Sequence, residues 1–216
     1  MKKRFLVQSV LLVLVAAGLC AWLYPSLPAS IPTHWNDSGV ADGFSPRLGI
    51  FIYSGIMLAV IAIWCLLPAI SPRRFTVDDF APTWWQGGVM LVAFLGYIQC
   101  VHAWAAYTGE VDMGRAALAG LALLFAFTGN VMGKVRRNFW FGIRTPWALA
   151  NERVWYATHR VAARAMVTGA ALALLLLLLR APNGWAVAAL VGSTLVPAAW
   201  SLLVYKRLER RGALES

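Results

Sequence analysis

Residues 134–160 combine the residue types that bind anionic groups and move protons. The arginines of this stretch can hold a phosphorylated group through paired N–H donors, and Asn138 and Thr145 add uncharged hydrogen-bonding groups. Glu152 and His159 can act as general acid and base. The same two side chains also fit a structural role, with Glu152 paired to nearby basic residues and His159 capping carbonyls, and we prefer that reading. The candidate binding residues are Asn130, Lys134, Arg136, Arg137, Asn138, Gly142, Arg144, Thr145, Pro146, Trp147, Glu152, Trp155, His159 and Arg160.

The charge of this stretch has a simpler explanation as well. Basic residues beside aromatic ones suit anionic lipid head groups, each basic residue contributing about 1 kcal/mol near the surface. A head-group anchor does not require the uncharged hydrogen-bonding residues, which are Asn130, Asn138, Thr145, Asn151 and Thr158. We therefore expect a folded loop of definite shape. Thr145 and Pro146 are typical of a helix start, and we expect one helix to run from Pro146 into the next apolar segment.

A second polar segment, residues 25–47, contains an imidazole close to carboxylates. His34, Asp37 and Asp42 make a metal or proton-transfer site conceivable, but their spacing matches no metal motif. The preferred reading is an ordered loop stiffened by prolines, in which Asn36 and Asp37 cap turns. We predict no metal and no cofactor. The candidate binding residues are Pro32, His34, Trp35, Asn36, Gly39, Asp42 and Gly43.

Two polar residues lie one helical turn apart inside an apolar run. Gln99 and His102 are candidate functional residues, although satisfied contacts between helices are as good an explanation. His34 and the acidic loop at Glu110 and Asp112 are the groups that we expect to approach His102 if it forms a site.

Long apolar runs position all these residues. Of the 216 residues, 60% are hydrophobic and 13% charged, which excludes an ordinary soluble domain with about 25% charged residues. About 20 apolar residues cross a bilayer as a helix. Such runs are Phe5 to Tyr24, Leu48 to Ile70, Trp84 to Tyr107, Arg115 to Gly133, Val161 to Arg180 and Trp185 to Tyr205. The predicted fold is all-α, a polytopic membrane helical bundle with about six transmembrane helices.

The distribution of basic residues predicts the orientation of this bundle. With the N-terminus inside, 16 of the 19 Lys and Arg lie in cytoplasmic segments, leaving Arg47, Arg115 and Arg180 outside. Both termini and residues 134–160 are then cytoplasmic, and residues 25–47 are extracytoplasmic. Because most of the basic residues fall on one side of the membrane, membrane topology explains the net charge of +10. We therefore expect no direct contact with nucleic acid. The first run also has features of a cleaved signal peptide, but its continuation through Trp22 and Tyr24 favours a span.

Two motifs resemble a known family. The C-terminal module of the SdpI family of bacterial membrane proteins is similar to Gly129-Asn130, Gly133-Lys134, Arg136-Arg137-Asn138-Phe139, Gly142-Ile143-Arg144-Thr145-Pro146-Trp147, Trp155 and Thr158-His159-Arg160. A short uncharacterised module that precedes it in many members resembles Ile31-Pro32-Thr33-His34-Trp35-Asn36, with Gly39 and Asp42-Gly43. We therefore predict two parts, residues 1–83 and 84–216.

The resemblance implies a non-enzymatic function at the bacterial cytoplasmic membrane. The namesake of the family gives immunity to a secreted antimicrobial peptide toxin and signals by holding a cytoplasmic regulator at the membrane. The expected partners are membrane lipids, a peptide toxin outside and a regulator inside. The alternative is a lipid-handling protein or membrane enzyme that binds an anionic head group through residues 134–160, so catalysis stays open. A transporter is disfavoured because no span has a charged residue at its midplane.

Overall fold

The computed structural model describes residues 1–36 and 39–214, with the side chain of Arg74 excepted. Within these residues the chain forms seven α-helices and one two-stranded sheet. The elements are α1 (Lys2–Leu23), β1 (Ser30–Trp35), β2 (Ala41–Pro46), α2 (Ile52–Leu66), α3 (Ala81–Thr108), α4 (Met113–Met132), α5 (Pro146–Ala150), α6 (Glu152–Leu178) and α7 (Asn183–Arg210). Short 3₁₀ segments cover Tyr24–Ser26, Arg47–Phe51, Arg73–Phe75 and Asp78–Phe80.

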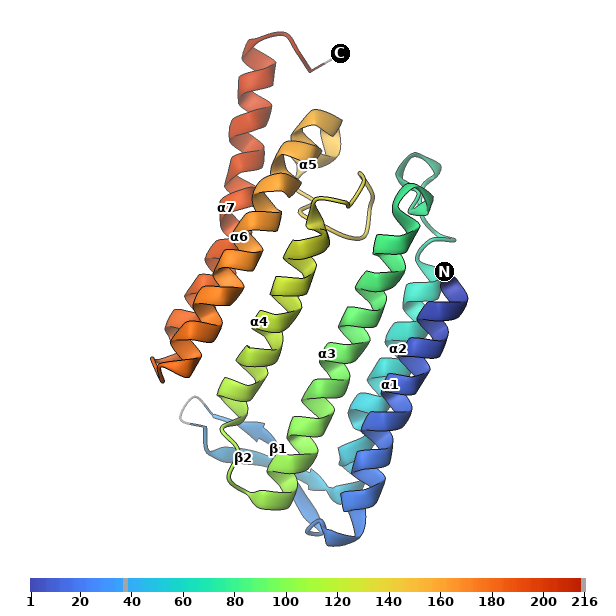
Figure 1. The fold of residues 1–216 in the computed structure, drawn as a ribbon, viewed down its shortest axis with the longest axis vertical. Helices are drawn as coiled ribbons and strands as arrows, with labels where there is room; N and C mark the ends of the chain where they lie inside the picture. The colour runs from blue at the N-terminus through green and yellow to red at the C-terminus, as the bar shows by residue number, and fades with distance from the viewer. Residues whose placement is uncertain (37–38, 215–216) are drawn as a thin grey trace. The chain divides into compact units, whose positions relative to one another are not determined.

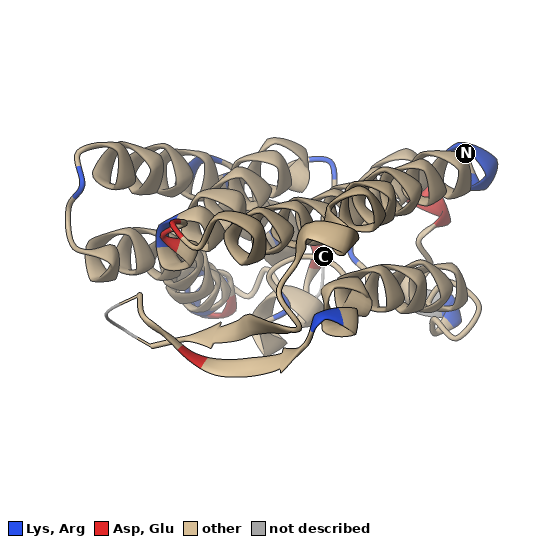
Figure 2. Ribbon diagram, turned by 90° about the horizontal axis from the view of Figure 1, so that it is seen from below, with Lys and Arg blue, Asp and Glu red and all other residues tan. Residues whose placement is uncertain are grey.

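Six helical segments of the described chain are long and apolar enough to cross a membrane, which confirms the predicted bundle. Helices suit lipid because they satisfy every backbone polar group within one segment. Many of their apolar side chains are exposed, Leu14 and Leu203 each at 61% and Leu178 at 79%, as lipid-facing residues are. Charged residues lie mainly at helix ends and in connections (Figure 2).

One predicted boundary is wrong. The second apolar run was expected to reach Ile70, but α2 ends at Leu66. Pro68 explains the early end, because a proline disfavours helical backbone at the residue before it. The fifth apolar run falls in α6, which begins at Glu152, ahead of Val161, as the helix predicted to lead into this run implied. The first turns of α6 therefore carry charged and polar residues.

The chain divides into two compact units, each formed from two separate segments. Unit 1 comprises Met1–Cys65 and Trp85–Leu121. In one of its apolar clusters, Leu27 and Ile31 pack with Cys20 of α1 and Ala103 of α3. This cluster packs the segment that follows α1 against α1 and α3.

A β-hairpin, residues 30–46, is the part of unit 1 that the all-α prediction did not include (Figure 1). Its strands pair antiparallel from Ser30 opposite Pro46 to Trp35 opposite Ala41, with an irregular register around His34. The strand sequences SIPTHW and ADGFSP show little of the alternation of apolar and polar residues that identifies strands. The predicted ordered loop is formed by this hairpin, and Asn36 caps its turn, but the strand pairing had no clear local signal.

Unit 2 comprises Leu66–Trp84 and Ala122–Ser216, and its longest helices, α6 and α7, form an antiparallel pair (Figure 1). Small residues allow them to approach closely, since a Cβ at Gly169 of α6 would lie 2.6 Å from the Cβ of Ser193 in α7. Close packing of this kind drives helix association where lipid removes the hydrophobic driving force. The connecting loop, residues 133–151, joins α4 to α6 and contains α5.

Candidate functional site

Asn138 organises the first half of the connecting loop. Its side chain is buried, and its Nδ2 donates to the carbonyls of Arg136 (2.8 Å) and Phe141 (2.9 Å). Its Oδ1 accepts from the backbone N–H groups of Trp140 (2.8 Å) and Phe141 (2.7 Å). Two donors and two acceptors are therefore satisfied by one amide, which folds the backbone around itself in the manner of an Asx turn.

His159 of α6 holds the second half of the loop. Its ring is 1% exposed, Nδ1 lies 2.8 Å from the carbonyl oxygen of Trp155, and Nε2 lies 3.2 Å from the backbone nitrogen of Ile143. A backbone N–H can only donate, so Nε2 must be the acceptor. The proton then resides on Nδ1, which donates to Trp155. The hydrogen bonds define the neutral tautomer with Nδ1 protonated.

Gly142 allows the loop to reach this histidine. Its φ of 120° lies in a region that residues with a Cβ rarely adopt. A Cβ at this position would also overlap the Nε2 of His159. Position 142 therefore needs glycine for both backbone conformation and space.

Trp155 forms a second buried contact between α6 and the loop. Its indole N–H donates to the carbonyl of Val135 at 2.8 Å, and its ring stacks on His159 with centroids 3.9 Å apart. The spacing of four residues places both rings on one face of the helix. The two stacked rings therefore pack against the connecting loop from one face of α6.

Two caps define α5 and α6 and correct the predicted continuous helix. Thr145 Oγ1 accepts from the N–H of Ala148 at 3.2 Å, which confirms the predicted helix start. The helix stops after Ala150 because Asn151 adopts φ −140° and ψ 133°, and its Oδ1 accepts from Arg153 N and Val154 N to start α6. Asparagine is among the best N-cap residues, so the break has a clear sequence signal that the continuous-helix prediction missed.

The loop arginines are bonded mainly to the protein itself. Arg136 donates to the Tyr156 hydroxyl at 2.7 Å, and this hydroxyl donates to Glu152 Oε1 at 3.0 Å. The hydrogen bond to Tyr156 raises the pKa of Arg136 above its ordinary value. Arg144 donates to the Phe139 carbonyl at 2.5 Å. The guanidinium of Arg137 lies 5.7 Å from the ring centroid of Phe75, within range of a cation–π contact.

The structure does not bring the predicted acid and base together. The carboxylate of Glu152 is exposed and bonded to Tyr156, whereas the His159 ring is buried and bonded to backbone groups. Tyr156, which the sequence reasoning missed, lies four residues after Glu152 on α6, and that spacing was the available signal. Thr145 bonds the hydroxyl of Ser201 in α7 at 2.7 Å, a contact with no local signal.

The predicted residues of this stretch fall into three classes of exposure. The buried ones are Asn138, Trp155 and His159; the half-buried ones are Arg137, Gly142, Thr145 and Trp147; the exposed ones are Asn130, Lys134, Arg136, Arg144, Pro146, Glu152 and Arg160. The buried and half-buried residues give the loop its shape. The exposed residues present a basic surface.

In unit 1, His102 holds the hairpin as His159 holds the connecting loop. Its Nε2 lies 2.8 Å from the carbonyl oxygen of Pro32, and its ring is 2% exposed. A carbonyl can only accept, so Nε2 carries the proton. Trp35 and Tyr53 meet the ring edge-on, with centroids 5.9 and 5.8 Å away. Among the described residues, His102 Nδ1 has no hydrogen-bond partner.

The remaining polar residues of the hairpin bond each other. His34 Nδ1 lies 2.5 Å from Asp42 Oδ1 across the two strands. Gly43 lies opposite His34, and a Cβ there would lie 2.8 Å from the His34 Cβ. At the turn, Asn36 accepts from Gly39 N and its Oδ1 accepts from Val40 N at 3.0 Å. Asp37, a predicted capping residue, lies outside the described residues.

Of the two polar residues predicted inside one span, His102 contacts the hairpin candidates Pro32 and Trp35, whereas Gln99 bonds other helices. Gln99 is buried, with Nε2 2.8 Å from the Ser54 hydroxyl and 3.2 Å from Cys20 Sγ, so its amide joins three helices. His34 pairs with Asp42, and Asp112 pairs with Arg115, so these side chains bond groups other than His102. Over the described residues no group of three or more His, Cys, Asp or Glu side chains is arranged to hold a metal.

Two stretches of the chain match known protein families. Residues 134–205 match the SdpI/YfhL protein family, and residues 11–58 match a domain of unknown function, DUF1648. The chain is 26% identical over 167 residues to the immunity protein SdpI of Bacillus subtilis (strain 168), an alignment that covers 77% of each protein. No solved structure matches the chain significantly.

Proposed function

Because the chain belongs to the SdpI family of multi-pass bacterial membrane proteins, we propose that it protects its own membrane against a secreted peptide toxin. The observation that carries this proposal is the alignment with the immunity protein of Bacillus subtilis, which spans 77% of both chains. A match of that extent is more informative for function than a match confined to one loop.

In the orientation that we propose, the two loops lie on opposite sides of the membrane. Three candidate spans, containing α2, α3 and α4, separate the hairpin from the connecting loop. The excess of Lys and Arg around the connecting loop and at the end of α7 favours the cytoplasm for that side. The hairpin then faces outward, where a secreted toxin first meets the protein.

The second part of the proposal is that the cytoplasmic side holds a regulator at the membrane. Exposed basic residues lie on the connecting loop and on the first turns of α6, including Lys134, Arg153 and Arg160. The Asn138 and His159 hydrogen bonds keep the loop in one shape, so these charges are displayed in a fixed arrangement. A fixed basic surface suits an acidic protein partner through complementary charge.

The lipid-processing alternative draws less support from the geometry. Asn138 and Thr145, which were expected to help bind a head group, use their side chains within the protein. Glu152 and His159 are bonded to different groups. The exposed arginines still fit head-group contact, which any protein with this orientation makes.

Deletion of the gene in its native cell tests the immunity function. We expect the deletion strain to lose viability in spent medium of the parent strain, and to survive once that medium has been treated with protease. A plasmid copy of the gene should restore survival. Equal survival of the deletion and parent strains in untreated medium would contradict the proposal.

Charge substitution tests the regulatory function separately. The triple variant Lys134→Gln, Arg153→Gln, Arg160→Gln keeps the bonds of Asn138 and His159 and removes three exposed charges. We expect fewer cytoplasmic proteins to co-purify with the membrane fraction of this variant, with unchanged survival in the toxin assay. An unchanged membrane-bound proteome would contradict recruitment by this surface.

A further inference from the structure

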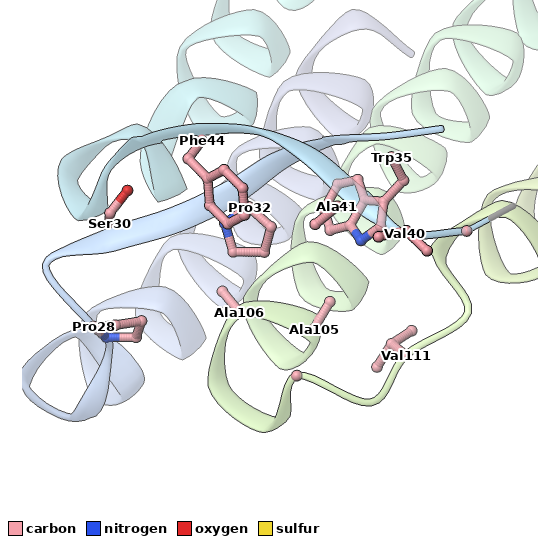
Figure 3. A pocket seen from close by; sticks show the side chains of 12 residues that line it. Pro28, Ser30, Pro32, Trp35, Val40, Ala41, Phe44, Ala105, Ala106 and Val111 are labelled. Carbon is pink, nitrogen blue, oxygen red and sulfur yellow. The ribbon is translucent and has the colours of Figure 1, made fainter. Parts of the chain in front are cut away.

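A groove in unit 1 lies between the hairpin and the last turns of α3 (Figure 3). Its volume is about 470 Å³, within the range of about 300–1,000 Å³ typical of ligand pockets. The hairpin contributes Pro32, Trp35 and Phe44, and α3 contributes Ala105 and Ala106. The groove is open, so a ligand can enter it without movement of a helix.

The side chains that line the groove are mainly apolar, and two of them are held in place. Phe44 is 61% exposed and Val40 60%, so both present apolar surface that nothing in unit 1 covers. Pro32 and Trp35 are held in place because the Pro32 carbonyl bonds His102 and the Trp35 ring contacts the His102 ring. The groove is therefore preformed for apolar side chains, and it loses little conformational entropy when they bind.

One carboxylate that is unpaired within the described residues lies beside the groove, although the protein as a whole is cationic. The chain carries a net charge of +10, yet the described residues of the hairpin and of the α3–α4 turn contain three carboxylates, those of Asp42, Glu110 and Asp112. Asp42 is bonded to His34 and Asp112 to Arg115. Glu110 lies between the lining residues Gly109 and Val111, is exposed, and makes no side-chain hydrogen bond or ion pair with the described residues.

We propose that this groove binds a peptide that carries both apolar and cationic side chains, with the apolar side chains against Phe44 and Trp35 and a cationic one at Glu110. The carboxylates disfavour an anionic lipid head group at the same place, and complementary charge speeds the encounter with a cationic peptide. The inference rests on the proposed immunity function, since the toxin is the peptide that the groove would take.

Binding of a defined probe peptide to the full-length protein tests the inference. The probe is a short fluorescein-labelled peptide in which leucines are flanked by lysines, and its partner probe has glutamates in place of the lysines. The protein is placed in phosphatidylcholine nanodiscs, whose lipids carry no net charge, and binding is followed by fluorescence anisotropy. We expect the lysine probe to bind at least about tenfold more tightly than the glutamate probe, and to weaken as salt is added.

Two substitutions locate the site. Phe44→Ala removes an exposed apolar contact and should weaken binding about tenfold, as expected from the transfer free energy of a phenylalanine side chain. Glu110→Gln removes one exposed charge and should weaken binding about threefold. The matched controls are Trp185→Ala and Glu209→Gln, which change an exposed aromatic residue and an exposed carboxylate on α7, and both should bind the probe as the wild type does.

Several outcomes would overturn the inference. They are binding no greater than to protein-free nanodiscs, equal binding of the two probes, or unchanged binding by both Phe44→Ala and Glu110→Gln. Survival assays separate this inference from the immunity function. If both variants protect the cell fully, the groove is not the toxin site, but the immunity function is unaffected. If the probe binds in the groove but the protein protects against no toxin, the immunity function is contradicted and the peptide site is not.

Discussion

The hairpin and the connecting loop are each held by one buried histidine of a membrane-spanning helix, but the two rings bond opposite backbone groups. His102 donates from Nε2 to the carbonyl of Pro32, whereas His159 accepts at Nε2 from the N–H of Ile143. The two histidines must therefore be opposite neutral tautomers.

The number of ring nitrogens in hydrogen bonds predicts how strongly the fold of each loop depends on its histidine. His159 uses both ring nitrogens, so an added proton on Nε2 would remove the acceptor for Ile143. His102 has an unpartnered Nδ1 within the described structure, so a proton added there leaves the hairpin bond intact. The connecting loop therefore requires a neutral histidine, whereas the hairpin bond does not.

Asparagine substitutions should show the largest contrast between the loops. Asn138→Ala removes four hydrogen bonds in a buried site, and we expect a loss of about 4 kcal/mol in the free energy of unfolding. Asn36→Ala, at the exposed turn of the hairpin, should cost about 1 kcal/mol. Unfolding by SDS in mixed micelles measures both. Equal losses would contradict the greater dependence of the connecting loop on its side chains.

Glycine substitution should give the next largest effect. Gly142→Ala places a Cβ against His159 and forces alanine into an unfavourable φ, so we expect a loss of about 3 kcal/mol. Gly133→Ala, at the start of the same loop, meets no atom within 4 Å and serves as the matched control. The thermal unfolding midpoint in detergent compares the two. Similar midpoints would show that the Gly142 conformation is not required.

Replacing each histidine by leucine tests the comparison directly. His159→Leu leaves the N–H of Ile143, a half-buried residue, without an acceptor and should cost about 2 kcal/mol. His102→Leu leaves the Pro32 carbonyl unpaired but also removes the unpartnered Nδ1, so we expect about 1 kcal/mol. The SDS titration ranks the two variants, and the reverse order would contradict the argument.

NMR of protein labelled with ¹⁵N at histidine determines which ring nitrogen carries the proton, and it does so without destabilising either loop. We expect the proton of His159 on Nδ1 and that of His102 on Nε2. Assignment uses the two leucine variants, each of which removes one set of signals. Finding both rings in the same tautomer would disprove the hydrogen-bond directions.

The smallest effect is expected at the exposed end of the connecting loop. Tyr156→Phe removes the hydroxyl that joins Arg136 to Glu152 on the surface of unit 2. Exposed polar contacts of this kind contribute up to about 1 kcal/mol, and we expect about 0.5 kcal/mol here. Tyr107→Phe, at an exposed tyrosine of unit 1, is the control. A loss near that of Asn138→Ala would mean that the exposed network, rather than the buried amide, holds the loop.

The sequence alone determined the membrane-spanning helices and several local turns. The thickness of the bilayer sets the length of a span, so six apolar runs predicted six helices in the described chain. Capping is equally local, and Thr145 before Pro146 marked a helix start correctly. The cap at Asn151 was just as visible, and the predicted continuous helix was wrong because it gave that signal too little weight.

Only the tertiary structure decided which residues meet. His159 lies 16 residues from Ile143 and His102 lies 70 residues from Pro32, so neither pair leaves a local pattern in the sequence. Whether a histidine donates or accepts follows from the backbone group that the fold places against it, and residue type cannot reveal this. The same holds for Gly142, whose need for glycine comes partly from a ring that folding brings beside it.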